Sequence, residues 1–107
     1  MASFRVDVDR GIHKEIRRLP GNVRQRVVRA LKALQVEPRP SESEALDLDK
    51  LAIELPTGVE PRRIRMDNWR IVYVIEEGDL LISVLAVRKR PPYQYDDLDE
   101  LIVGLLG

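Results

Sequence analysis

The sequence of 107 residues contains no cysteine and only one histidine, His13. The lack of cysteine excludes disulfides and thiolate metal sites. His13 has no second histidine at ligand spacing, so we interpret it as a surface residue and not as a metal ligand or general base. The sequence also has no glycine-rich phosphate loop, no serine–histidine pairing and no carboxylates clustered at metal-ligand spacing. We therefore expect no metal and no cofactor, and metal-dependent hydrolysis, nucleotide-triphosphate chemistry and acyl transfer have no support.

Long apolar segments are lacking as well. Residues 1–7 contain no apolar signal region, and no stretch is long enough to span a bilayer. We therefore expect a cytoplasmic protein without membrane contacts. A length of 107 residues and a hydrophobic content of 44% predict one domain, over residues 1–107, with one modest core.

The net charge is zero, which taken alone argues against a nucleic-acid-binding protein. The charges are nevertheless unevenly distributed. Residues 1–35 have nine basic and three acidic side chains, and residues 61–92 have seven and four. Residues 36–60 have two and seven, and residues 93–107 have none and four. A neutral protein can therefore present a local basic surface, although a solvated face is the simpler interpretation of any single block.

Apolar residues at helical spacing predict two consecutive helices. The first begins after Asp9, a suitable cap residue, and ends at Pro20-Gly21. Asn22 and Gln25 have the spacing of a capping box for the second. The break between the helices is short, which predicts a helical hairpin. The apolar stripes are Ile12, Ile16 and Leu19 in the first helix and Val23, Val27, Leu31 and Leu34 in the second.

A small sheet is predicted around this hairpin. Residues 4–8 alternate as a short strand does, residues 37–44 are predicted to be a loop, and residues 46–55 fit either a helical turn or a first β segment. Further strands are predicted at residues 61–66, at residues 69–76 and at residues 80–88. The second of these three is almost wholly apolar, so we expect a central strand covered on both faces.

The C-terminal residues predict a last helix, which Asp96 or Asp97 would cap. Val103 and Leu106 fall outside its apolar face and predict exposed apolar surface, which often marks a protein contact. The resulting order, β-α-α-β-β-β-α, predicts an α+β fold. In this fold the helical hairpin packs on one face of a small, mainly antiparallel sheet.

Several arginines are predicted to lie on the face of the sheet opposite the helical hairpin. Arg63 and Arg65 alternate with apolar residues, and Arg70 lies in the next strand, so sequential pairing places all three on the face away from the hairpin. A basic turn, Arg88-Lys89-Arg90, follows the last strand, and the tyrosines of residues 93–95 come after it. Charges that guard a sheet edge and tyrosines that cover its end are the structural alternatives.

Converging arginines and a phenol suit RNA cleavage, because RNA carries its own nucleophile, the 2′-hydroxyl. Arginine binds phosphate oxygens in bidentate fashion but is a poor general acid, since its pKa exceeds about 12. Tyrosine has an ordinary pKa of about 10, and neighbouring arginines favour the phenolate. Tyr93 or Tyr95 could therefore serve as a base or as a stacking platform for a nucleotide.

The order and spacing of these segments resemble the RelE/ParE toxin superfamily, in particular RelE-like mRNA interferase toxins of type II toxin–antitoxin systems. The resemblance covers essentially the whole chain and is carried by Arg63-Ile64-Arg65, by Trp69-Arg70-Ile71-Val72-Tyr73, and by a last strand running into Lys89-Arg90 and a tyrosine. It implies a metal-independent endoribonuclease that cleaves mRNA on the ribosome by attack of the 2′-hydroxyl. It also implies a cognate antitoxin protein as partner, besides the ribosome and mRNA.

The chemistry and the resemblance together predict a set of site residues. The predicted catalytic residues are Arg65, Arg70, Arg90 and Tyr95, and the predicted RNA-binding residues are Arg63, Arg88, Lys89 and Tyr93. The double proline leaves open which tyrosine matches that of the family.

The chain departs from the family pattern at Arg63 and Arg65, where the best-known members have lysines. Arginine is expected to keep the phosphate contact there but not to donate a proton, so either Lys89 substitutes as the donor or cleavage is slow. A ParE-like, non-catalytic inhibitor of DNA gyrase and a degenerate binding module without activity are the alternative functions.

Overall fold

The computed structural model describes residues 3–47 and 53–106. Over this part of the chain the elements are β1 (Arg5–Asp7), α1 (Arg10–Arg17), α2 (Gly21–Ala33), β2 (Ser43–Ala45), β3 (Val59–Met66), β4 (Trp69–Glu76), η2 (Glu77–Asp79), β5 (Leu81–Lys89) and α3 (Leu98–Leu106). The single 3₁₀ turn among these, η2, joins β4 to β5. None of the helices in the described residues is long and apolar enough to cross a membrane.

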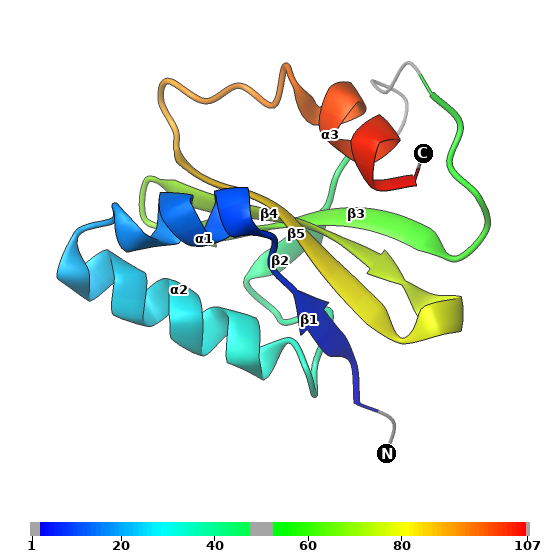
Figure 1. Ribbon diagram of the computed structural model, residues 1–107, viewed down its shortest axis with the longest axis horizontal. Coiled ribbons are helices and arrows are strands. Elements are labelled where there is room, and N and C mark those ends of the chain that lie inside the picture. The colour runs from blue at the N-terminus through cyan, green and yellow to red at the C-terminus, as the bar shows by residue number, and fades with distance from the viewer. Residues whose placement is uncertain (1–2, 48–52, 107) are drawn as a thin grey trace.

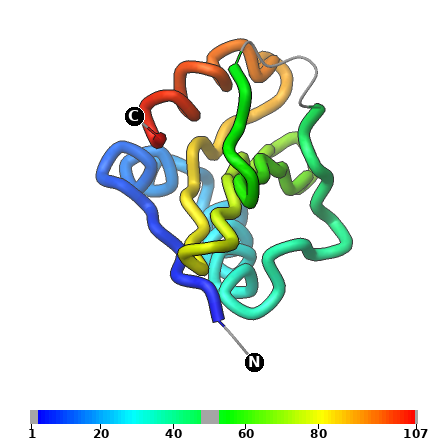
Figure 2. Tube along the Cα trace, turned by 90° about the vertical axis from the view of Figure 1, so that its right-hand side faces the viewer, coloured from blue at the N-terminus to red at the C-terminus, as the bar shows by residue number. Residues whose placement is uncertain are grey.

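The strands form one sheet in the order β1-β5-β4-β3-β2. β1 pairs with β5 in parallel, and the other neighbours are antiparallel. The predicted α+β fold with a mainly antiparallel sheet is therefore confirmed. β4 is the central strand, as its apolar sequence predicted, and α2 and α3 lie on opposite sides of the sheet (Figures 1 and 2).

Both faces of the sheet are covered, each by its own core. The helical hairpin, α1 and α2, packs against one face, where alternate residues of β4 such as Ile71 and Tyr73 are buried. α3 packs against the other face, where Val72 and Val74 are buried together with Ile102 of the helix. Alternate side chains of β4 therefore point into two different hydrophobic cores, and neither set points into solvent.

Two local predictions were wrong. The capping box at Asn22 does not form, because the N-cap of α2 lies two residues earlier, at the extended residue Pro20, and the helix begins at Gly21. The predicted loop contains the start of the short edge strand β2, which pairs with β3. Its residues Ser43 to Ala45 do not alternate between apolar and polar, so periodicity could not reveal it. The ambiguous segment after it falls partly on residues 48–52, which lie outside the described residues.

Polar contacts hold β2 and the loop before it in place. The hydroxyl of Ser43 donates to the carbonyl oxygen of Pro40 at 2.7 Å and accepts from the guanidinium of Arg62 at 2.9 Å. The hydroxyl of Tyr73, a fully buried residue, donates to the carbonyl oxygen of Pro38 at 2.8 Å. By contrast, the predicted cap of α1 is confirmed, since an Asp9 carboxylate oxygen accepts from the backbone N–H of Ile12 at 2.9 Å.

A β-bulge interrupts the pairing of β4 with β5. Val72 is the Cα partner of Ala86, whereas the next residue, Tyr73, is the partner of Val84, so Leu85 is an extra residue in β5. A bulge reverses which face the residues beyond it occupy. Beyond this one, Arg88 stands opposite Arg70 on the α3 side of the sheet.

Shortening a side chain on either face of β4 should destabilise the protein, because both faces are buried. Ile71 and Val72 are each 0% exposed. We expect Ile71→Ala to lower the free energy of unfolding by about 2–5 kcal/mol and Val72→Ala by about 2 kcal/mol. Urea denaturation followed by the fluorescence of Trp69 measures both. Val28→Ala, at a residue of α2 that is 40% exposed, is the control and should change it by less than about 0.5 kcal/mol. A cost at one of the two β4 positions alone would show that one face is open.

Candidate functional site

Three arginines stand side by side across the sheet. Arg65 of β3 and Arg88 of β5 are both Cα partners of Arg70 in β4, and we call these three residues the arginine row. Arg63 precedes Arg65 by two residues in β3 and so points to the same face. The structure thus brings Arg63, Arg65 and Arg70 to the face predicted from the sequence. Like charges placed directly opposite one another destabilise a sheet, so the arginine row calls for a functional explanation.

The guanidinium groups of the arginine row have different surroundings. Arg65 is exposed. A terminal nitrogen of Arg70 donates to the backbone carbonyls of Asp67 and Trp69, at 2.9 and 2.8 Å, so this side chain folds over the β3–β4 turn. Arg88 bonds to two carboxylates, those of Glu15 and Asp97. The row therefore holds one solvated cation, one cation on backbone dipoles and one in an ionic cluster.

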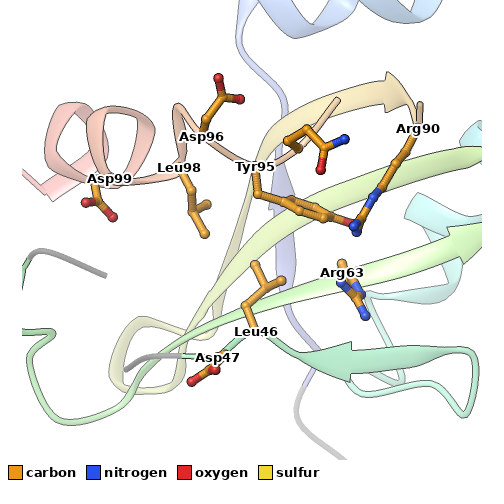
Figure 3. A pocket seen from close by; sticks show the side chains of 9 residues that line it. Leu46, Asp47, Arg63, Arg90, Tyr95, Asp96, Leu98 and Asp99 are labelled. Carbon is orange, nitrogen blue, oxygen red and sulfur yellow. The ribbon is translucent and has the colours of Figure 1, made fainter. Parts of the chain in front are cut away.

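Two further arginines converge on Tyr95, which follows the last strand. The Cζ atom of Arg90 lies 5.0 Å from the centroid of the Tyr95 ring, and that of Arg63 lies 5.5 Å from it. Both distances are those of cation–π contacts. Figure 3 shows the Tyr95 side chain pointing toward the two arginines from the segment before α3. Arg63 is also bonded to Glu44 of β2, at 3.0 Å.

A cavity of about 430 Å³, which we call the Tyr95 pocket, opens beside these groups. Among the described residues, its lining consists of Leu46, Asp47, Arg63, Arg90, Gln94, Tyr95, Asp96, Leu98 and Asp99. The lining is polarised, because the two arginines and the tyrosine lie toward one end and the aspartates toward the other (Figure 3). An anion would therefore be bound at the arginine end.

Several polar atoms here have no hydrogen-bond partner within the protein. They are the Nε atoms of Arg63 and Arg70 and the hydroxyl oxygen of Tyr95, all of them buried. Buried donors in folded proteins are nearly always paired, so unpaired ones call for an explanation. A phosphodiester, whose oxygens accept hydrogen bonds, would satisfy such donors.

The backbone of Tyr95 is also unusual. Its φ angle is 63°, in the left-handed region that residues with side chains rarely adopt. Conformations of this kind cluster at functional sites, where the surrounding structure enforces them. The strain at Tyr95 therefore supports its selection as a site residue.

Tyr93 has a different environment from Tyr95, although the two rings are in edge contact with centroids 5.0 Å apart. Tyr93 is only 8% exposed, and its hydroxyl donates to Asp97 at 2.9 Å. Burial, and after it the hydrogen bond to the Asp97 carboxylate, raise the pKa of Tyr93 far above its ordinary value. Tyr93 is thus unsuited to act as a base, and little of its ring is open to a stacked nucleotide. Of the two tyrosines left open by the sequence, Tyr95 is the candidate.

The three residues of the basic turn do not share one environment. Arg90 lines the Tyr95 pocket, and Arg88 faces the α3 side within its ionic cluster. Lys89 is exposed, is the Cα partner of Trp69 and does not belong to the lining of the Tyr95 pocket. The structure therefore does not bring Lys89 together with the residues around Tyr95.

Sequence reasoning missed the partners of Arg88. Glu15 lies in α1, 73 residues away, and no local pattern connects the two residues. Asp97 was predicted only as a cap, and α3 does begin directly after it. Its carboxylate accepts hydrogen bonds from both Arg88 and Tyr93. Burial raises the pKa of Asp97, but these two hydrogen bonds together lower it by more than burial raises it, so the net shift of the pKa is downward. In the described part of the chain no three carboxylates or histidines are grouped so as to hold a metal ion.

The fold is shared with solved toxin structures. A chain of the archaeal RelE–RelB complex from Pyrococcus horikoshii superimposes with a TM-score of 0.70 and 22% identity, over 85% of this chain and 99% of the other. The E. coli toxin RelE, as a double mutant in the free state, gives a TM-score of 0.62 and 21% identity over the whole of both chains. The chain has the RelE fold.

A third RelE-fold structure, the toxin–antitoxin complex RelBE2 from Mycobacterium tuberculosis, gives a TM-score of 0.61 and 21% identity, over 82% of this chain and 99% of the other. No family model and no curated protein matches the chain by sequence. The likeness of this RelE-fold protein to its neighbours is therefore one of structure, and the expected RelE-like architecture is confirmed at that level.

The raised pKa of Tyr93 predicts a dependence of stability on alkaline pH. Above about pH 10, the ordinary tyrosine pKa, the unfolded chain loses the phenolic proton while the folded protein keeps it, so the contribution of Tyr93 to stability falls as pH rises. We expect Tyr93→Phe to be less stable than the wild type by about 1–2 kcal/mol at pH 8, through loss of the hydrogen bond. Urea denaturation should show this difference shrinking toward pH 11. A difference that stays constant with pH would contradict the assignment.

Proposed function

We propose that this chain is the toxin of a type II toxin–antitoxin system and a ribosome-dependent, metal-independent endoribonuclease that cleaves mRNA. The observation that carries the proposal is the convergence of Arg63 and Arg90 on Tyr95, next to a pocket and with unpartnered donors. The RelE fold supports it, since the neighbours in that fold are toxins and toxin–antitoxin complexes. Cations and a phenol suffice for this chemistry, because the substrate supplies the nucleophile.

In the proposed reaction the 2′-oxygen forms a bond to phosphorus, and the bond from phosphorus to the 5′-oxygen breaks. Tyr95 is the general base of this proposal: its side-chain oxygen, once it has lost its own proton to solvent, accepts the proton of the 2′-hydroxyl. Arg63 and Arg90, which line the pocket, bind the phosphate oxygens. Arg65 and Arg70, which lie outside its described lining but on the same face of the sheet, stabilise the negative charge that develops on these oxygens. None of the described residues that line the Tyr95 pocket is a lysine, and in this proposal water protonates the 5′-oxygen that leaves. The products are a 2′,3′-cyclic phosphate and a 5′-hydroxyl.

Substrate must rearrange the arginines before Tyr95 can act. The Tyr95 hydroxyl is buried in the substrate-free protein, although the residue lines the pocket. A phosphate that draws Arg63 and Arg90 onto its oxygens would uncover this hydroxyl. A charge-assisted hydrogen bond from arginine to phosphate is stronger than a cation–π contact at a partly exposed site, so the exchange is favourable.

The alternative of a non-catalytic gyrase inhibitor gains less from this geometry. A protein-binding surface has no need of unpartnered arginine donors beside a tyrosine. The ribonuclease proposal explains both the unpartnered atoms and the strained backbone at Tyr95.

Substitutions in the site should abolish cleavage without unfolding the protein. We expect Arg63→Ala, Arg70→Ala and Arg90→Ala each to reduce the rate of mRNA cleavage on purified ribosomes by about 100-fold or more. Tyr95→Phe, which keeps the ring and removes the hydroxyl, should also lose about 100-fold or more, whereas Tyr93→Phe should lose much less. The control is Arg29→Ala, at an exposed arginine of α2. Mapping the 5′ ends of cellular transcripts after induction provides the same comparison in vivo.

Two results would overturn this proposal. If Arg70→Ala and Tyr95→Phe still cleave mRNA at the wild-type rate, the catalytic roles proposed for Arg70 and Tyr95 are wrong. Toxic expression that stops DNA supercoiling before translation would favour the gyrase inhibitor.

The proposed partner is a cognate antitoxin that also contacts α3. Val103 and Leu106 of this helix are 51% and 39% exposed, as their positions in the sequence predicted. Exposed apolar side chains on an amphipathic helix are suited to a protein contact.

We expect the double substitution Val103→Ser/Leu106→Ser to weaken binding of the protein encoded by the adjacent open reading frame. About tenfold in Kd, measured by titration calorimetry, is the expected size. Val28→Ser on α2 is the matched control. An unchanged Kd would place the contact elsewhere, and a neighbour that neither binds nor relieves toxicity would remove the antitoxin from the proposal.

A further inference from the structure

Arg88 differs from the other arginines near the site in the number of groups that hold it. Its Nε donates to a carboxylate oxygen of Glu15 in α1 at 3.1 Å, and a terminal nitrogen donates to Asp97. Its Cζ lies 5.0 Å from the centroid of the Tyr93 ring. Burial lowers the pKa of Arg88, but the hydrogen bonds to Asp97 and Glu15 together raise it by more than burial lowers it. The net shift of the pKa is upward, which favours the charged form. A phosphate could bind this guanidinium only by displacing two carboxylates.

Asp97 connects this cluster to the loop that contains Tyr95. One of its carboxylate oxygens accepts from Arg88, and the other accepts from the hydroxyl of Tyr93 at 2.9 Å. Tyr93 and Asp97 are four residues apart, so their hydrogen bond closes residues 93–97 into a small loop. Tyr95 is the central residue of that loop.

The loop needs such support, because Tyr95 has a φ angle of 63°. A tyrosine remains in this conformation only if contacts around it enforce the backbone. The hydrogen bond between Tyr93 and Asp97 restrains both ends of the loop, and the charge of Arg88 holds the carboxylate in place. Backbone bonds from Tyr93 to Lys89 and from Leu98 to Tyr95 add to this restraint, at 3.0 and 3.2 Å.

We propose that Arg88, Asp97 and Glu15 form a latch that fixes the loop of residues 93–97 through Tyr93 and so places Tyr95 beside Arg63 and Arg90. Arg88 is then a positioning residue, and it acts on the reaction through Tyr93 and Asp97 without contacting RNA. This role replaces the RNA-binding role predicted for Arg88 and Tyr93 from the sequence. The proposal deepens the ribonuclease function and rests on it, since the position of Tyr95 affects the rate only if Tyr95 acts on RNA.

The latch also explains how distant parts of the chain meet at the site. Arg88 lies in β5, Glu15 in α1 and Asp97 immediately before α3. β1 pairs with β5 only as far as Asp7 and Ser83, and α1 contacts β5 after β1 has ended. Glu15 can therefore reach Arg88 around the edge of the sheet.

Cleavage kinetics of the whole 107-residue chain distinguish a positioning residue from a phosphate ligand. Arg88→Met removes the charge and keeps the length of the side chain, and Asp97→Asn keeps the shape of the carboxylate. We expect each to lower kcat for cleavage of ribosome-bound mRNA by about 100-fold with KM nearly unchanged, because Tyr95 is displaced. The double variant should lose no more than the single ones, because the residues act as one unit. Arg29→Met is the control and should match the wild type.

The dependence of RNA binding on salt provides a second discriminator. A lost phosphate contact lowers the slope of log K against log salt concentration by about one. We expect this change for Arg63→Met and no change for Arg88→Met. If Arg88→Met lowers the slope as Arg63→Met does, and Asp97→Asn tightens RNA binding, then Arg88 is a phosphate ligand masked by Asp97 and the latch is wrong.

A structural readout separates failure of the latch from failure of the proposed function. The protein has three tyrosines, so the ring resonances of Tyr95 can be assigned by NMR with single Tyr→Phe variants. They should shift in Arg88→Met and Asp97→Asn and stay unchanged in Arg29→Met. If the resonances shift but the wild-type protein cleaves no RNA, the latch is supported and the proposed ribonuclease function is wrong. Unchanged resonances and unchanged kcat in a protein that does cleave RNA would overturn the latch alone.

Discussion

Repulsion among arginines that face one another across the sheet is the constraint on which the candidate site depends. Arg65, Arg70 and Arg88 are neighbours on adjacent strands, and like charges directly opposite one another in this way destabilise a sheet. The protein offsets this cost with solvent at Arg65, backbone carbonyls at Arg70 and carboxylates at Arg88. Binding of an anion on this face would lower the repulsion further, which gives a phosphate-rich ligand a favourable starting point.

Much of the fold could be predicted from the sequence, because the signals that define it are local. The stripe of Val23, Val27 and Leu31 indicated α2, and alternation around Ile64 placed Arg63 and Arg65 on one face. What remained hidden depends on contacts between distant residues. Among the strands of the described residues, β2 pairs only with β3, and its own three residues do not alternate between apolar and polar as a strand does.

The site was predictable in its residue types more than in its arrangement. Arginine alternation and sequential strand pairing are enough to bring Arg63 and Arg70 to one face. Tyr93 and Tyr95 could not be told apart, because both follow the same basic turn and their difference lies in burial and in the sign of φ. The function of Arg88 was equally hidden, since Glu15 and Asp97 meet it only in the folded protein.

The extra residue at the Leu85 bulge decides which face of the sheet each later residue of β5 occupies. Val72 pairs with Ala86 and Tyr73 with Val84, so one residue is left over. In a continuous ladder Arg88 would stand opposite Trp69 and point toward the helical hairpin, away from Tyr93. Two chains of this fold can therefore have an arginine at the same distance from the β4–β5 turn and yet display it on opposite sides of the sheet. An alignment of such chains must therefore locate the bulge first. Until the number of residues before it is known, matching residues beyond it cannot be assigned to a face of the sheet.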